Sequence, residues 1–281
     1  MKRYGWLLGC CLFLSIGMLW AADEPDLRML QQKAAQSRDM EGYVGVCKYL
    51  YQTEENPELL LLYADSIHQL ATKSKKPEQL VEYYIWASEG NFIKGDFQQG
   101  YALKRKAIAL AEKAGLKFAI SQSCCDMGYY CNVDARYDSA RYYFRKGLEA
   151  GEDLSEAGEA CRTMLTNYAS SFLFEGKTDS ALVYTIRASE RSAADKDTAM
   201  LIENLNQLGT IYRRKKNLEN CIANFEQALH LCELRGNHNA VAFIYGNIAT
   251  AYCDWNRPVD AIPFSEKAVE YALKTGNKRR I

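Results

Sequence analysis

Small and apolar residues recur along the chain with one rhythm of about 40 residues. The first series of small residues lies within apolar helical stripes and holds Ser88, Gly128, Ala169, Gly209 and Ala249, at steps of 40, 41, 40 and 40. Two further series keep the same steps and hold Gly100, Ala140, Ala181, Cys221 and Ala261, and then Ala107, Gly147, Ala188, Ala228 and Ala268. A fixed period of this size predicts a stacked array of helix pairs, five of them over residues 77–281.

The small residues predict close contact between the two helices of each pair. Two antiparallel helices approach closely only where one side chain is small, so a glycine or alanine of the first helix should receive a bulky side chain of the second. Phe144 and Phe225 lie four residues after the second series of small residues, on the same face of the second helix.

Turn residues separate the apolar stripes. Four glycines are expected to cap the ends of second helices: Gly115, Gly151, Gly236 and Gly276. The third copy lacks this glycine and breaks instead at residues 192–198. Before the array, residues 23–76 predict further helices over 26–36, 41–52 and 56–74, as a cap or a decayed sixth repeat.

This pattern resembles the tetratricopeptide repeat. The best match is the copy that carries Leu205, Leu208, Gly209, Tyr212, Phe225 and Ala228, and it departs from the family at Cys221, where alanine is usual. The next copy carries Tyr245, Ile248, Ala249, Tyr252, Ala261 and Ala268, with its aromatic residue one place early at Phe264. The resemblance implies an all-α, right-handed superhelical solenoid of antiparallel helix pairs, with helices longer than is usual in the family.

Residues 1–22 have the layout of a secretory signal peptide. Lys2 and Arg3 precede an apolar stretch that ends near Trp20, and small residues follow at Ala21 and Ala22. An uncleaved membrane anchor is the alternative, because the stretch approaches spanning length, and lipidation at Cys10 is a third interpretation. Each predicts an exported protein, in the periplasm or on the outer face of the inner membrane of a bacterium.

The end of the sequence repeats an earlier helix start. Gly276 and Asn277 stand 40 residues after Gly236 and Asn237, and a helix follows that earlier pair. A stacked array needs a polar capping helix at its end, and the sequence shows none after the last helix pair. We therefore expect the chain to be a fragment of a longer protein, the alternative being a natural end with Arg279 and Arg280 in solvent.

Composition argues against several functions. Lys and Arg equal Asp and Glu at 35 each, so no net charge draws the chain to nucleic acid or to an anionic membrane. The three histidines and ten cysteines form no metal-binding motif, and we expect most cysteines to be buried apolar residues. No catalytic motif or phosphate-binding loop occurs, so neither an enzyme nor a cofactor is expected. The basic run at 213–216 is interpreted as the end of a first helix, where cations favour the helix dipole.

The resemblance places a binding groove on the first helices. Family groove positions fall in this sequence on Asp126, Tyr129, Asn132, Thr166, Asn167, Ser170, Asn206, Thr210, Arg213, Asn247, Thr250 and Asp254. Several are amides or hydroxyls, which can bond to an extended peptide backbone. The alternative is that they are only solvated polar positions.

Two functions follow from the resemblance. One is a non-catalytic scaffold that binds a protein or peptide. The other is the sensor region of a longer membrane-bound regulator of signalling or transcription, with its membrane helix and output domain beyond residue 281. The partner, the biological process and the oligomeric state are not predicted by the sequence.

Overall fold

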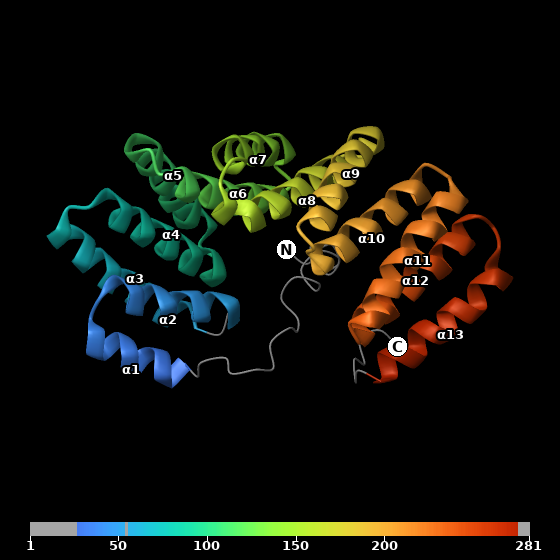
Figure 1. The fold of residues 1–281 in the computed structure, drawn as a ribbon, viewed down its shortest axis with the longest axis horizontal. Helices are drawn as coiled ribbons and strands as arrows, with labels where there is room; N and C mark the ends of the chain where they lie inside the picture. Colours follow the sequence, from blue (N-terminus) through green and yellow to red (C-terminus); the bar gives the residue numbers. More distant parts are fainter. Residues whose placement is uncertain (1–26, 54–55, 275–281) are drawn as a thin grey trace. The chain divides into compact units, whose positions relative to one another are not determined.

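The protein is all-helical over the residues that its computed structural model describes, 27–53 and 56–274 (Figure 1). The expectations for residues 1–22 and for Gly276 and Asn277 onward lie outside these residues. The α-helices are, in order, α1 (Leu27–Ser37), α2 (Met40–Thr53), α3 (Pro57–Ser74), α4 (Pro77–Lys94), α5 (Phe97–Ala114), α6 (Lys117–Val133), α7 (Tyr137–Gly151), α8 (Gly158–Phe174), α9 (Thr178–Ala194), α10 (Thr198–Arg214), α11 (Leu218–Leu234), α12 (His238–Asp254) and α13 (Pro258–Lys274). A short 3-10 helix, η1 (Ser155–Ala157), precedes α8.

The helices form two compact units, which divide inside α8 between Cys161 and Arg162. The core of the first unit gathers apolar residues of α1–α6, with Val46, Leu60 and Ile85 among them. The core of the second unit gathers residues of α10–α12, with Phe225 and Ile248 almost fully buried. Within the described residues, no helix is both long and apolar enough to span a membrane.

The expected contact between glycine and phenylalanine is confirmed. A Cβ atom added to Gly128 would lie 2.3 Å from Cε1 of Phe144, and one added to Gly209 would lie 2.5 Å from Cε1 of Phe225. Both distances are far below van der Waals contact, so only glycine allows these rings to lie against the first helix. Where the first helix carries alanine instead, at Ala169 and Ala249, the phenylalanine position holds Thr185 or Ser265.

The turn inside each helix pair keeps one backbone conformation. Its left-handed residue has a φ between 54° and 88° in all five copies and is Gly95, Ala135, Gly176, Lys216 or Asn256. Only two of the five are glycines, although a side chain in this conformation costs about 1 kcal/mol. The helix pairing therefore determines this turn more strongly than the residue does.

One predicted cap is wrong. Gly115 and Gly236 end their helices with positive φ, as expected. Gly151 is instead the last residue of α7, and the residue after it, Glu152, has a φ of −57°. A Cβ atom on Gly151 would lie 2.3 Å from Oγ of Ser121, so this glycine serves close packing between α7 and α6.

The cysteines behave mainly as apolar core residues. Of the eight in the described residues, seven are buried, while Cys253 is exposed. Burial raises the pKa of Cys47 and of Cys232 to about 12. These thiols therefore stay protonated at neutral pH. The burial of seven of the eight confirms the expectation that most cysteines are buried apolar residues.

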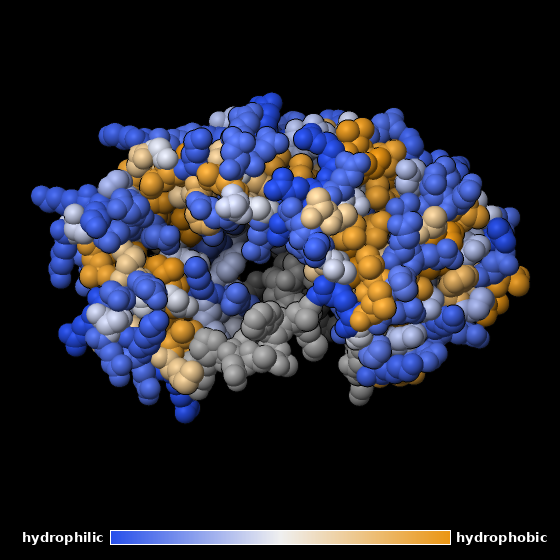
Figure 2. Space-filling view, viewed as in Figure 1, coloured by the Kyte–Doolittle hydropathy of each residue, from blue (hydrophilic) through white to orange (hydrophobic). Residues whose placement is uncertain are grey.

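The last helix exposes an apolar stripe. Val259, Ile262, Val269 and Leu273 are all exposed on α13, and their spacing places them along one side of the helix. Figure 2 shows hydrophobic surface at the edge of the view where α13 lies. The corresponding residues Ile222 and Leu229 of α11 pack against the core of the second unit.

Candidate functional site

The predicted groove residues differ in how accessible they are. In the first unit, α6 holds Asp126 and Tyr129 half-buried and Asn132 buried. In the second unit, Thr166 and Ser170 of α8 are buried, whereas Asn206, Thr210 and Arg213 of α10 are half-buried. The remaining predicted residues of this unit are half-buried or exposed: Asn167, Asn247, Thr250 and Asp254. Their role in binding stays a prediction. The most accessible of the predicted groove residues lie on α10 and α12.

Polar side chains connect successive first helices of the second unit. Asn247 of α12 donates from Nδ2 to Oδ1 of Asn206 on α10 at 2.7 Å, and Arg213 pairs with Asp254 at 3.6 Å. The Asn206–Asn247 bond uses one N–H of Asn247 and the oxygen of Asn206. It leaves the NH2 group of Asn206 as a donor and the oxygen of Asn247 as an acceptor for a ligand.

Between α8 and α10 the polar groups are used internally. Gln207 donates from Nε2 to Oγ of Ser170 at 2.7 Å and accepts at Oε1 from the Thr185 hydroxyl at 2.9 Å. The Thr166 hydroxyl donates to Oδ1 of Asn204 at 2.8 Å. Thr166 and Ser170 therefore already have partners inside the array, because the polar groups of neighbouring helices satisfy one another.

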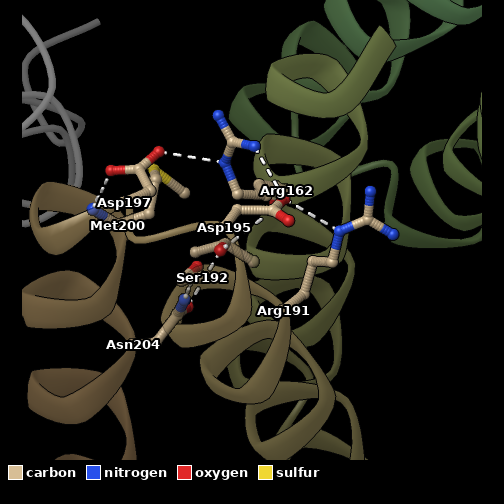
Figure 3. A network of polar contacts seen from close by, with 8 residues as sticks. Arg162, Arg191, Ser192, Asp195, Asp197, Met200 and Asn204 are labelled. Atoms are coloured by element: carbon tan, nitrogen blue, oxygen red, sulfur yellow. Dashed lines mark hydrogen bonds and ion pairs between the residues drawn. The ribbon is translucent and has the colours of Figure 1, made fainter. Parts of the chain in front are cut away.

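An ion-pair network holds the connection between α9 and α10 (Figure 3). Arg162 of α8 contacts Asp195 at 2.8 Å and Asp197 at 2.9 Å, and Arg191 also contacts Asp195 at 2.9 Å. Asp197 is in addition the N-cap of α10 and accepts from the backbone N–H of Met200. This is the break that lacks a capping glycine in the sequence. The ion pairs explain how this connection is held without a capping glycine and without a bound ligand.

Basic residues of the run at 213–216 also make contacts within the second unit. Arg213 and Arg214 lie in the last turn of α10, as the dipole interpretation expected. Arg214 donates to the backbone oxygen of Leu173 at 2.7 Å, and Lys215 pairs with Asp179. These contacts tie α10 to α8 and α9 within the second unit.

The first unit buries a charged cluster that the sequence analysis missed. Lys104 of α5 is 0% exposed and pairs with Glu89 of α4 and, at 3.0 Å, with Asp126 of α6. Glu89 also accepts from the hydroxyl of Tyr130 at 2.8 Å. Burial disfavours the charge of Lys104, but Asp126 and Glu89 together raise its pKa, so it stays a cation.

Lys104 occupies a repeat position that is aromatic in two of the other four copies. Counted by the period, it corresponds to Phe144, Thr185, Phe225 and Ser265. The repeat spacing alone places this lysine at a core position. Because a cation at a core position requires buried partners, the charged cluster could have been predicted. Asp126 is one of those partners, so this predicted groove residue has a structural role in the cluster.

Two more polar residues of α10 were missed by the sequence analysis. Gln207 corresponds by the period to Asn167 and Asn247, which were predicted as groove residues. The same spacing therefore indicates that Gln207 is also a groove position. Half-buried Glu203 lies one turn before Gln207. Burial, with a further contribution from the negative charge of Asp197, raises the pKa of Glu203 to about 7.

Glu203 should make stability depend on pH. Its folded-state pKa of about 7 lies above the ordinary value of 4.5, so the folded chain binds this proton more tightly than the unfolded chain. The stability that it contributes is full below pH 4.5 and is lost as pH rises through 7. We expect Glu203→Gln to reduce the loss of unfolding free energy between pH 5 and pH 8 by about 1 to 3 kcal/mol.

Urea unfolding at the two pH values measures this loss. Glu226→Gln, which changes an exposed carboxyl of α11, is the matched control and should leave the pH dependence as it is in the native chain. An unchanged pH dependence in Glu203→Gln would contradict the assignment.

Comparisons with known proteins support the repeat pattern. A family model described as tetratricopeptide repeat matches residues 199–274. No curated protein matches the chain.

Solved structures share the fold at low sequence identity. BtubC (BKLC) from P. vanneervenii is 16% identical, with a TM-score of 0.65 over 82% of this chain and 92% of that chain. The apo form of RapI is 11% identical, with a TM-score of 0.70 over 90% of this chain and 71% of that chain. A Rap protein complexed with Competence and Sporulation Factor is 11% identical, with a TM-score of 0.57 over 90% and 73%. At these identities the likeness concerns the fold.

Proposed function

We propose that this chain, whose residues 199–274 match the tetratricopeptide repeat, binds a peptide or an extended segment of another protein along the first helices α10 and α12. The fold is an all-α helical repeat solenoid, and similarity to a Rap protein that was solved with a bound factor favours a binding function. We propose that this binding is non-catalytic.

The Asn206–Asn247 pair is the observation that carries the proposal. Each amide is half-buried, which limits its side-chain freedom, and their mutual hydrogen bond orients both groups. This bond leaves the NH2 group of Asn206 as a donor and the oxygen of Asn247 as an acceptor, and an extended peptide backbone needs both kinds of group. Thr210 and Thr250 lie one turn further along the same two helices, and Arg213 adds a cation that Asp254 partly balances.

The test is a peptide selection with the purified chain. Peptides enriched from a random displayed library are synthesised, and their Kd is measured by calorimetry for the native chain and for the double variant Asn206→Ala/Asn247→Ala. Losing two oriented hydrogen bonds should weaken binding roughly 10-fold or more.

The matched control is Asn224→Ala, which removes an amide of the second helix α11 and should leave the Kd unchanged. Thermal unfolding of each variant shows that the fold is retained. Equal affinity of the double variant and the native chain would refute the assignment of the binding face.

Export is the second part of the proposal. The layout of residues 1–22 supports a secretion signal or an anchor, and the sensor region of a longer membrane-bound regulator remains the alternative function. Expression of the chain in a bacterium, followed by cell fractionation and N-terminal sequencing, tests export. Recovery of the chain in the cytoplasm with residues 1–22 intact would refute it.

A further inference from the structure

A surface hollow of about 440 Å³ lies on the second unit between α9, α10 and α11. Its apolar lining comes from Leu201 and Leu205 of α10, with Ala193 of α9 and Leu231 of α11, and its polar lining from residues of α9 and α11. The polar lining residues are Ser189, Glu190, Gln227 and His230. None of them belongs to the proposed peptide-binding face.

The hollow has a cause in the repeat pattern. Ser189 stands where the other second helices carry an aliphatic residue, namely Ile108, Leu148, Leu229 and Val269. Ile108 is buried, and Leu229 packs against the core of its unit. The third copy therefore lacks a branched aliphatic side chain that the array supplies elsewhere, and space is left above Leu201 and Leu205.

The next interface along the array indicates what fits this space. There, Leu229 takes the place of Ser189 and Tyr245 takes the place of Leu205. Lys267, which corresponds to Gln227, places its ammonium nitrogen 5.2 Å from the ring centroid of Tyr245. The equivalent surface is thus covered by aliphatic carbon and by the cationic end of a lysine side chain.

We infer that the hollow binds a lysine side chain of a partner protein. The methylene chain lies against Leu201 and Leu205, and the ammonium group remains at the edge near the exposed carboxylate of Glu190. Lysine commonly divides its contacts in this way, with the stem on apolar surface and the charge in water. A carboxylate ligand would be repelled by Glu190, and an uncharged aliphatic ligand would gain nothing from it.

The experiment uses n-pentylamine, which reproduces a lysine side chain from Cα to Nζ. The leucine methyl groups of the chain are labelled with ¹³C, and the amine is titrated at pH 8, where it is charged. The methyl signals of Leu201, Leu205 and Leu231 should shift in a saturable way. Pentanol should bind about threefold more weakly and pentanoate more weakly still, because each lacks the attraction to Glu190.

Two variants separate the parts of the site. Ser189→Leu should abolish the saturable shifts and raise the melting temperature, because the side chain fills the hollow as Leu229 does in the next copy. Ser189→Val is a smaller replacement if leucine disturbs the fold. Glu190→Gln should make pentylamine bind no better than pentanol, whereas Glu226→Gln, the matched control on α11, should preserve the difference.

The inference is overturned if Ser189→Leu leaves the shifts intact, if pentanoate binds as well as pentylamine, or if no saturable shift occurs. These results do not depend on Asn206 or Asn247. A failure here is therefore distinct from a failure of the proposed peptide-binding face.

Discussion

Lys104→Met should lower the free energy of unfolding of the first unit by about 3 to 5 kcal/mol, because it removes one partner of a buried ion pair. Methionine nearly matches lysine in length, so the main loss is the positive charge. Glu89, whose side chain is 3% exposed, and Asp126, at 24%, then face each other without the cation between them. Urea unfolding followed by circular dichroism measures the change.

Two further variants separate charge from packing. Lys106→Met changes an exposed lysine of the same helix and should cost less than about 0.5 kcal/mol. The triple variant Lys104→Met/Glu89→Gln/Asp126→Asn removes the uncompensated charges and should recover most of the loss. If Lys104→Met is as stable as Lys106→Met, the buried cluster has no role in the stability of this unit.

Phe225→Ala has the second large expected effect, a loss of about 3 to 5 kcal/mol in the second unit. The ring is fully buried and fills the space that Gly209 leaves on α10. Gly209→Ala in the native chain should also destabilise, because its Cβ would lie 2.5 Å from the ring. In the Phe225→Ala background the same change should stabilise the helix by up to about 1 kcal/mol.

A double-mutant cycle on these two positions measures the coupling, which should be about 2 kcal/mol or more. Gly246→Ala provides the control. Gly246 lies within α12, and nothing approaches its Cβ position within 4 Å, so this change should stabilise the chain slightly. Additive effects of Gly209→Ala and Phe225→Ala would contradict the packing described for this pair.

The repeat fold could be predicted from the sequence because its signals are local and recur. Three series of small residues determined the period of the repeat. The N-terminal helices predicted from turn residues over 26–36, 41–52 and 56–74 agree with α1, α2 and α3 to within about one residue at each end. The wrong cap at Gly151 has a different origin. Its role depends on Ser121 in another helix, and a sequence does not show which glycine faces a neighbour.

The candidate site was less predictable for the same reason. Family positions identified Thr166 and Ser170 as groove residues, yet Asn204 and Gln207 of the next repeat bond to them. Asp126 likewise has a buried lysine as its partner. Whether a polar side chain remains available to a ligand therefore depends on a residue of a neighbouring helix, 22 to 38 positions away in these three cases, and the identity of one residue does not determine that.

The exposed stripe of α13 has a consequence for the behaviour of the chain in concentrated solution. Val259, Ile262, Val269 and Leu273 offer apolar surface, and the formal net charge of the chain at pH 7 is zero. Long-range repulsion between molecules is therefore weakest near neutral pH, where apolar surfaces come together most readily. Colloidal stability should improve on either side of neutrality, and an added charge in this stripe, for example Ile262→Lys, should improve it at pH 7 itself.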